Sequence, residues 1–318
     1  MGLFPRNLLE YVALQGIPVG PNSNIFLVDP ANGSNSNPGT DFKHPLLTLP
    51  AAIAKCTTGQ HDTIVVLGSA TALTLTTALT WNLNLTHLIG MGAPTPYGKR
   101  TRIISGADDL SPLITISGYG CIFKNLRIVH EQADDTGSLV NVSLIAGAHR
   151  NFFENVEFAG CATASSAIDT GCSLKITAAS ENYFKDCVIG LDTIVQATGC
   201  MAMVVAGSGA ARNRFDRCIF AGYAGHNNAG LVEVLDGTSM DRAWVFRDCE
   251  FINLGSNTMA SAFIFTNPDN RWKRMFLINC WGHGFTDWDA GDTGMLFGNM
   301  DRMTAGGVAG YLLASVVT

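Results

Sequence analysis

Charged side chains are scarce in this sequence. Only 14% of its 318 residues are charged, against 47% hydrophobic residues, whereas a typical soluble domain carries about a quarter charged residues. The 20 basic and 26 acidic residues give a net charge of −6, and no run of Lys and Arg is present, so we expect no nucleic-acid partner. The high hydrophobicity also excludes a disordered chain, which needs few apolar residues and a high net charge.

The patterns of a secreted or membrane-bound protein are missing as well. Residues 1–6 show no basic stretch leading into an apolar run and a cleavage site, and the apolar residues 304–318 are too few to span a bilayer. The nine cysteines are an odd number and form no CxxC pair, so we expect neither a zinc site nor a secreted disulfide framework. The expectation is a protein made in a cytoplasm, with no membrane partner, metal or cofactor.

What the sequence does contain is an internal repeat. A motif of the form aromatic, any residue, Asn or Asp, apolar, any residue, apolar recurs with small departures through the second half of the chain. Its copies occupy residues 123–128, 153–158, 184–189, 215–220, 246–251 and 277–282. Successive copies start 30, 31, 31, 31 and 31 residues apart, and a fixed period in this range is typical of repeat architectures.

The motif favours β-strands over helices. Its apolar positions fit two short strands joined at a corner, because Asn and Asp tolerate the left-handed backbone that a sharp corner needs. Arg217 replaces the Asn or Asp in one copy. A further apolar strand lies about ten residues before each copy, as at 113–116 and 174–176. Three strands per coil predict an all-β protein, a right-handed parallel β-helix with about 31 residues per coil.

The regions outside the repeat suggest a division of the chain. Residues 46–56 have helical spacing with Pro50 near the start, which favours a short helix that caps the first coil. We expect the β-helix domain to span residues 25–300. The flanking residues 1–24 and 301–318 are rich in large apolar side chains, and such exposed surface usually marks an interaction site.

The first coils resemble a known family. The segment 25–40, with its Asn-Gly-Ser-Asn turn at 32–35, is followed by the capping segment 45–53, the strand 62–67 and the glycine turn 88–92. Together they resemble the N-terminal cap and first coils of pectin-lyase-like β-helix proteins, and the resemblance extends over roughly residues 25–285. That superfamily includes lyases, hydrolases, phage tailspikes and capsid-associated phage proteins, so the resemblance implies a fold and leaves the function open.

A metal or lyase site of that superfamily would need acids at equal register in neighbouring coils. The outward positions after the corner hold Arg127, Glu157, Val188, Ile219 and Glu250. No two adjacent coils therefore supply an acid there, and we expect no metal site.

A hydrolase site has one weak candidate region near the end of the repeat. Gly282-His283-Gly284 resembles the Gly-His-Gly of polygalacturonases, and Asp287 and Asp289 follow it. No Arg-x-Lys follows this histidine, although the polygalacturonase pattern requires it. We therefore expect no catalytic residue, and His283, Asp287 and Asp289 stand as the alternative.

Three further sets of residues recur at coil spacing or gather near the end. Cys187, Cys218, Cys249 and Cys280 share one register, and we expect them to be small buried hydrophobic residues without disulfides. The equally spaced Asn151, Asn182 and Asn213 predict a hydrogen-bonded structural ladder. Trp244, Trp272, Trp281 and Trp288 could stack on sugars or pack against a neighbouring subunit, and we expect the subunit interface.

These observations leave three functions open. The first expectation is a non-enzymatic structural protein of a phage particle, a capsid decoration or fibre-like spike, located in the virion after assembly in the host cytoplasm. Its expected partners are further copies of itself in a homotrimer and other virion proteins such as the major capsid protein. The alternatives are a tailspike-type polysaccharide depolymerase, acting as a lyase or a glycoside hydrolase, and an adhesion module that binds surface glycans.

Overall fold

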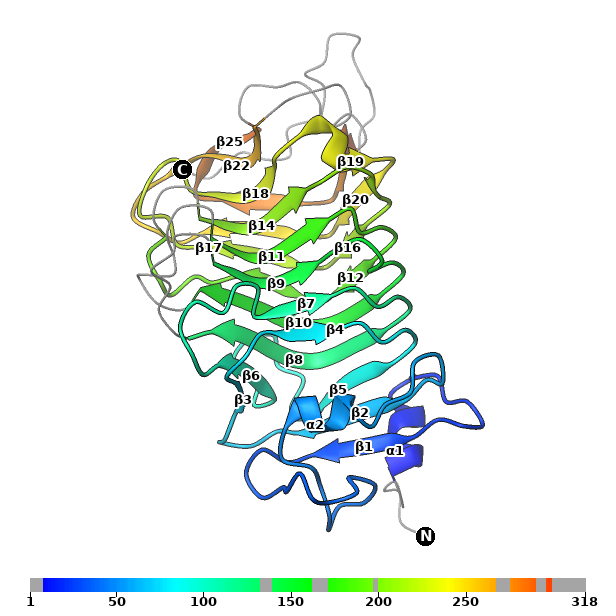
Figure 1. Cartoon of the computed structure of the whole chain (residues 1–318). Helices are drawn as coiled ribbons and strands as arrows, with labels where there is room; N and C mark the ends of the chain where they lie inside the picture. Colours follow the sequence, from blue (N-terminus) through cyan, green and yellow to red (C-terminus); the bar gives the residue numbers. More distant parts are fainter. Residues whose placement is uncertain are drawn as a thin grey trace.

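Successive segments of the chain wind into a stack of parallel strands around one apolar interior (Figure 1). The computed structural model describes residues 8–131, 139–161, 171–196, 200–266, 275–289 and 296–298. Strands in these residues pair in parallel with strands of neighbouring coils. This arrangement confirms the all-β, right-handed parallel β-helix with coils of about 31 residues.

The strands occupy three faces of the solenoid. The first face consists of β1 (Ile25–Val28), β2 (Thr63–Leu67), β5 (His87–Met91), β8 (Ile122–His130), β10 (Phe152–Cys161), β12 (Tyr183–Lys185), β16 (Arg214–Asp216), β20 (Trp244–Arg247), β23 (Met275–Ile278) and β26 (Leu296–Gly298). The second face consists of β3 (Leu73–Leu75), β6 (Arg102–Ser105), the later halves of β8 and β10, β13 (Val188–Gly190), β17 (Ile219–Gly222), β21 (Glu250–Asn253) and β24 (Trp281–His283).

The third face is a separate sheet of eight strands. It consists of β4 (Leu79–Trp81), β7 (Ile114–Ile116), β9 (Val140–Leu144), β11 (Cys172–Thr177), β14 (Met201–Ala206), β18 (Gly230–Val234), β22 (Met259–Phe265) and β25 (Phe285–Asp289). A small pair, β15 (Ala210–Ala211) and β19 (Met240–Asp241), follows the turns after β14 and β18, next to the 3-10 turn η1 (Gly237–Ser239).

The corner between the first and second faces has the predicted backbone. Its residue adopts a left-handed conformation in each copy of the motif, with φ between 51° and 56° at Asn125, Asn155, Asp186, Arg217, Asp248 and Asn279. Arg217, the one residue there that is neither Asn nor Asp, has φ 51° like its neighbours. The geometry of the corner therefore persists where the residue type departs from the motif.

The aromatic residue of the motif forms the centre of the core. Phe123, Phe153, Phe184, Phe215 and Phe246 are buried and lie one above another. Their ring centroids are 4.9, 4.7, 4.6 and 4.8 Å apart, and adjacent ring planes differ by 5–8°. The strand spacing of about 4.8 Å in a sheet sets this separation. The predicted inward phenylalanine stack is confirmed.

Two ladders of equivalent residues, one of asparagines and one of cysteines, accompany the stack, and both were predicted. In the first, the backbone N–H of Asn151 donates to Asn182 Oδ1 at 3.0 Å, and that of Asn182 donates to Asn213 Oδ1 at 3.0 Å. Each of the three side-chain amides also donates to a backbone carbonyl at 2.9–3.0 Å, so these buried polar groups are paired. In the second ladder, the Cys187, Cys218, Cys249 and Cys280 thiols are free and donate to backbone carbonyls one coil earlier.

A short helix lies beside the first coil. Helix α2 (Leu49–Ile53) falls within the predicted capping segment 46–56, and the Thr48 hydroxyl caps it by accepting the Ala51 N–H. Leu49 and Ala52 are buried in the core with side chains of the first strands. The helix therefore covers apolar side chains at this end, where no earlier coil can cover them (Figure 1).

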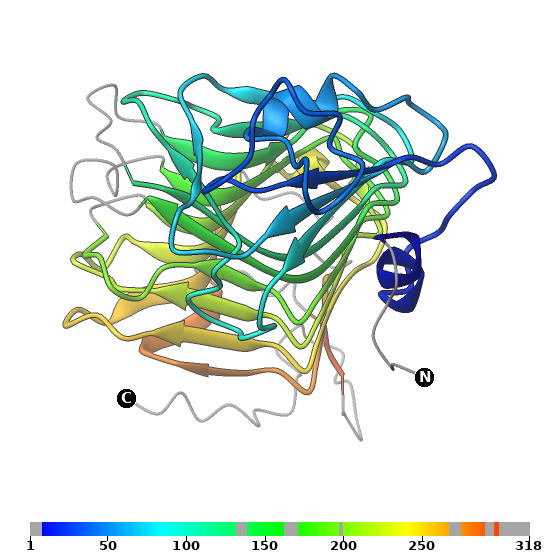
Figure 2. The ribbon, with the colours of Figure 1, turned by 90° about the horizontal axis from the view of Figure 1, so that it is seen from below.

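Helix α1 (Leu8–Leu14) lies on the outside of the solenoid (Figure 2). Val12 and Ile17 are buried against Leu27, Val65 and Ile89, which alternate with core residues on β1, β2 and β5 and so point outward. Outward side chains of the first coils therefore cover part of the apolar segment 1–24. Residues 1–7 and 299–318 lie outside the described part of the chain.

Candidate functional site

The structure places the three candidate hydrolase residues on two faces of the solenoid. His283 ends β24 on the second face, whereas Asp287 and Asp289 belong to β25 on the third face. The Asp287 side chain is exposed, and its Oδ1 accepts the backbone N–H of Trp288 at 2.7 Å. Among the residues with described side chains, no hydrogen bond or ion pair joins His283 to Asp287.

The tryptophans do not form one exposed aromatic face. Trp244 is fully buried, and its indole N–H donates to the Ala210 carbonyl at 3.0 Å. Trp288 is buried against Phe251 and Phe285. Trp281 is 47% exposed, and Trp272 lies outside the described residues. The expected shared surface is therefore wrong for Trp244 and Trp288, because both side chains contribute to the core or its end.

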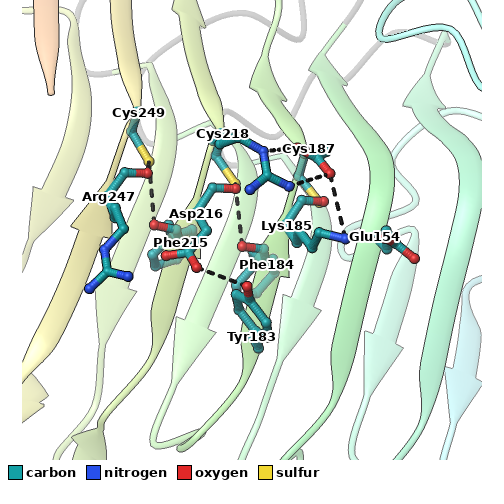
Figure 3. Close-up of polar contacts among 12 residues, drawn as sticks. Glu154, Tyr183, Phe184, Lys185, Cys187, Phe215, Asp216, Cys218, Arg247 and Cys249 are labelled. Carbon is teal, nitrogen blue, oxygen red and sulfur yellow. Dashed lines mark hydrogen bonds and ion pairs between the residues drawn. The ribbon is translucent and has the colours of Figure 1, made fainter. Parts of the chain in front are cut away.

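A row of alternating charge runs along the outside of the first face. Lys124, Glu154, Lys185, Asp216 and Arg247 occupy equal register in five successive coils. Glu154 lies between two lysines, with Lys124 Nζ 2.7 Å from Oε2 and Lys185 Nζ 2.5 Å from Oε1. Figure 3 shows Glu154 beside Lys185. Burial opposes ionisation of Glu154, but the two ammonium groups outweigh it and hold its pKa below the usual value.

Asp216 continues the row through a different set of partners. Its Oδ2 accepts the Tyr183 hydroxyl at 2.8 Å (Figure 3), and Arg214 Nε donates to Oδ1 at 2.8 Å. The Arg214 guanidinium also lies 5.6 Å from the centre of the Tyr183 ring. Burial and the hydrogen bond to Asp216 raise the pKa of Tyr183 to about 12. The tyrosine therefore stays protonated and holds the carboxylate in place.

A groove of about 560 Å³ follows the corner next to this row. Lys124, Asn125, Glu154, Asn155, Asp186, Cys187, Val188, Arg217 and Ile219 line its floor, and Gln15, Pro94 and Pro96 line its walls. The floor thus crosses four coils, from β8 to β16 and β17. Arg217 Nε and Nη2 donate to Asp186 at 2.7 and 2.9 Å, so this pair is bidentate. We call this feature the corner groove.

One wall of the corner groove is the loop of residues 94–99, which is held by side chains of the loop itself and of the second face. Glu157 is buried on the second face, and its Oε2 accepts the Gly98 N–H at 3.0 Å. Arg127 Nε lies 3.1 Å from Glu157 Oε1. Lys99 is also buried, and its ammonium donates to the Pro96 carbonyl at 2.6 Å. These contacts fix the loop against the coils.

Burial shifts the pKa of both ionisable side chains under the loop. Burial lowers the pKa of Lys99 to about 8, although the nearby Glu157 opposes the shift. Burial likewise raises the pKa of Glu157 against the effect of Arg127 and Lys99. Both shifts show that desolvation outweighs pairing here, as expected for ions taken out of water.

The other wall comes from the N-terminal segment. The backbone carbonyl of Gln15 accepts a hydrogen bond from Lys124 Nζ at 3.2 Å. The turn that follows helix α1 therefore contributes to the groove, while the helix covers the first coils. In the part of the chain that the structure describes, no group of three or more His, Cys, Asp or Glu could hold a metal ion. No described helix is long and apolar enough to cross a membrane.

Comparison with known proteins supports the fold but identifies no family. No family model matches the sequence, and no curated protein matches it. Among solved structures, a pectate lyase, Pel9A, is similar with a TM-score of 0.59 at 15% identity, covering 89% of this chain and 76% of the other. A rhamnogalacturonan lyase gives 0.58 at 14%, covering 82% and 68%. Pectin methylesterase PemA from Erwinia chrysanthemi gives 0.55 at 16%, covering 83% and 80%.

These neighbours are all right-handed parallel β-helix proteins that process polysaccharides. The resemblance to pectin-lyase-like proteins is therefore confirmed for the fold. The phage branch of that superfamily is not shown by the comparisons.

The corner groove was not predicted from the sequence, although the repeat contains part of the pattern that forms its floor. Lys124, Glu154, Lys185, Asp216 and Arg247 each follow the motif aromatic by one residue, so their alternation in charge could have been read from the repeat. The walls had no such signal, because residues 15 and 94–99 lie outside the repeat.

Proposed function

We propose that this chain is a polysaccharide-binding β-helix protein that holds an extended glycan along the corner groove. The observation that carries the proposal is the groove itself, whose floor presents one set of polar side chains per coil over four coils. A polymer of similar sugar units can meet such a repeated set of donors and acceptors along its length. The neighbouring folds support this choice, since their names describe enzymes of pectin and rhamnogalacturonan.

The groove chemistry suits hydroxyl groups. The amides of Asn125 and Asn155 both donate and accept hydrogen bonds, and the Asn155 amide donates to Asn125 Oδ1 at 2.9 Å. Asp186 and Arg217 are paired with each other but remain 39% and 53% exposed. Sugar hydroxyls can therefore replace water on these groups without breaking the ion pair.

Binding fits the groove better than cleavage. Glycoside hydrolysis uses two carboxyl groups, one of which donates a proton. Of the groove carboxylates, Asp186 is held in a bidentate pair by Arg217, and the two lysines beside Glu154 keep its pKa below the usual value, in the charged form that has no proton to give. The tailspike-type depolymerase is tested by incubating the protein with the glycan it binds, and release of reducing ends or unsaturated sugars would favour it.

Two arginines of one coil provide a matched test of the proposal. Arg217 lines the groove and Arg212 does not, yet both have left-handed φ (51° and 52°) and similar exposure (53% and 52%). Each also pairs with an acid one coil earlier, Asp186 for Arg217 and Glu181 for Arg212.

The protein should retain a glycan from an array of bacterial polysaccharides. Arg217→Ala should weaken that binding about tenfold, which is about 1.4 kcal/mol, and Arg212→Ala should leave the dissociation constant unchanged. Equal effects of the two substitutions, or no binding to any glycan on the array, would contradict the proposal.

A second candidate is a structural protein of a phage particle, assembled as a homotrimer with virion proteins such as the major capsid protein. The specific observation is on α1, where Val12 is buried against the solenoid but Leu14 is 73% exposed. The low charge of the chain agrees with surface hidden against partners. Light scattering of the full chain tests it: a trimer that dissociates when residues 1–20 are deleted supports this candidate, and a stable monomer removes it.

A further inference from the structure

The row of corner residues continues beyond the corner groove. Arg217 lines the groove, and its backbone N–H donates to the Arg247 carbonyl at 2.8 Å, so Asp248 has the equivalent position in the next coil. The Asp248 N–H likewise donates to the Ile278 carbonyl at 2.9 Å, and Asn279 follows in the coil after that. Both Asp248 and Asn279 are exposed. The corner row therefore extends over six coils, of which the groove includes four.

The side chains of the corner row are hydrogen-bonded in twos. In each pair the later residue donates to the earlier one: Asn155 to Asn125 at 2.9 Å, Arg217 to Asp186 at 2.7 and 2.9 Å, and Asn279 to Asp248 at 2.6 Å. Among these described side chains, no hydrogen bond joins one pair to the next. A pair therefore recurs every two coils, which is about 9.6 Å at the strand spacing of a sheet.

The corner before the first face is arranged differently. There Glu181 lies 2.7 Å from Arg150 and 2.6 Å from Arg212, which are one coil away on either side. That row is thus joined continuously across three coils. Grouping in twos is therefore not a general consequence of stacking coils, and it belongs to the corner that carries the groove.

The pairs leave polar atoms available for a ligand. Asn155 and Asn279 each use Nδ2 within their pair, and in the part of the chain that the structure describes no hydrogen bond is made to their Oδ1 atoms. A sugar hydroxyl can donate to such an amide oxygen. Because the pairing already holds each amide in place, little side-chain freedom is lost when a ligand binds.

We infer that the corner row binds an extended glycan over all six coils, and that this glycan has a disaccharide repeat. This inference rests on the proposed function, and it adds the length of the site and the class of glycan. An extended chain of pyranose rings advances by about one coil height per sugar. Each sugar then lies over one coil and each disaccharide over one pair, so equivalent groups of the glycan meet equivalent groups of the protein.

The experiment measures dissociation constants of the full chain for four-sugar and six-sugar fragments of bacterial polysaccharides that have a disaccharide repeat. Asn279→Gly removes the last amide of the row, and glycine suits the φ of 52° at this position. It should weaken binding of the six-sugar fragment about five- to tenfold, as expected when one or two hydrogen bonds are lost. The four-sugar fragment fills the groove alone, so its dissociation constant should not change.

Asn257→Gly is the matched control. The Asn257 side chain is also exposed and also donates to the preceding coil, to the Gly225 carbonyl at 2.8 Å, but it lies outside the corner row. Its loss should change neither dissociation constant. Arg217→Ala, in contrast, should weaken binding of both fragments, because Arg217 lines the groove.

The outcomes separate this inference from the proposed function. Equal binding of the six-sugar fragment by wild type and Asn279→Gly would overturn the six-coil site, even where Arg217→Ala still weakens binding and upholds the groove. Binding confined to polysaccharides with other repeats, and weakened by Arg217→Ala, would overturn the disaccharide repeat alone. Failure of every glycan to bind would overturn both the inference and the proposed function.

Discussion

The coils between residues 122 and 253 differ in kind from those between residues 25 and 116. In the later coils each core position recurs at nearly constant spacing, so Phe, Asn and Cys each stack on their own kind. In the earlier coils Ile64 pairs with Leu88 and Leu88 with Phe123, so these coils are 24 and 35 residues long. The phenylalanine stack ends where this irregularity begins, with Trp81 packed edge-on against Phe123.

The two regions contribute different parts of the corner groove. Regular coils produce flat rows of side chains, and the floor of the corner groove is made of such rows. Irregular coils contain additional residues that form walls, and the loop of residues 94–99 belongs to the 35-residue coil. A groove in a β-helix thus needs both regions, because identical coils alone would leave a flat surface.

The largest expected effect is a loss of stability when the phenylalanine stack of the regular region is interrupted. Phe184 packs between Phe153 and Phe215 at 4.7 and 4.6 Å, and Phe184→Ala should lower the free energy of unfolding by about 3–5 kcal/mol. The control is Phe42 in the irregular region, which is 54% exposed. Phe42→Ala should change stability by less than about 0.5 kcal/mol in denaturant titrations. Similar losses for the two variants would contradict the central role of the stack.

The second prediction concerns the pH dependence of stability that His87 causes in the irregular region. His87 is fully buried, its Nδ1 accepts the Ile122 N–H at 3.1 Å, and its Nε2 lies 3.1 Å from His61 Nδ1. Burial and the neighbouring His61 lower the pKa of His87 to about 4.

Between pH 6.5 and 4 the unfolded chain therefore binds a proton at His87 that the folded chain does not. The stability that His87 contributes is complete above pH 6.5 and should fall by about 3 kcal/mol as the pH drops to 4. His87→Asn, which can retain the acceptor for Ile122, should remove this part of the pH dependence. Equal pH profiles for wild type and His87→Asn would refute the assignment.

The smallest of the three effects concerns the asparagine ladder. Asn182→Ala leaves the Asn151 N–H and the Ala148 carbonyl without their partners, and a buried unpaired group costs about 1–3 kcal/mol. We expect a loss of about 2 kcal/mol on thermal or chemical unfolding. Asn228, exposed in a turn, is the control, and its replacement by Ala should have almost no effect. A neutral Asn182→Ala would show that water satisfies the ladder.

Much of the fold could be predicted because the repeat encodes it locally. The spacing of Phe123 and its counterparts gave the core, and the Asn or Asp after each gave the left-handed corner, which even Arg217 adopts. The cysteine and asparagine ladders followed from equal register alone. In each case a residue lies next to its own equivalent one coil away, so residues that are one period apart in the sequence are neighbours in space.

The groove could not be predicted, because its walls depend on contacts that no period relates. The Gln15 carbonyl meets Lys124 across 109 residues, and Gly98 meets Glu157 across 59. Helix α1 packs on outward side chains of β1, β2 and β5, which lie outside the repeat. His283 was a candidate because Gly282-His283-Gly284 resembles a polygalacturonase motif, and Asp287 and Asp289 because they follow it. The turn after β24 places the histidine and the two acids on different faces.

Hydrogen–deuterium exchange with and without a bound glycan tests the central claim most directly. A glycan in the corner groove should slow exchange in peptides covering residues 122–126, 153–157, 184–188 and 215–219, and in the wall loop 94–99. The third face, for example residues 172–177 and 201–206, should exchange at the same rate in both states. Protection confined to the third face, or none at the corner, would contradict the account.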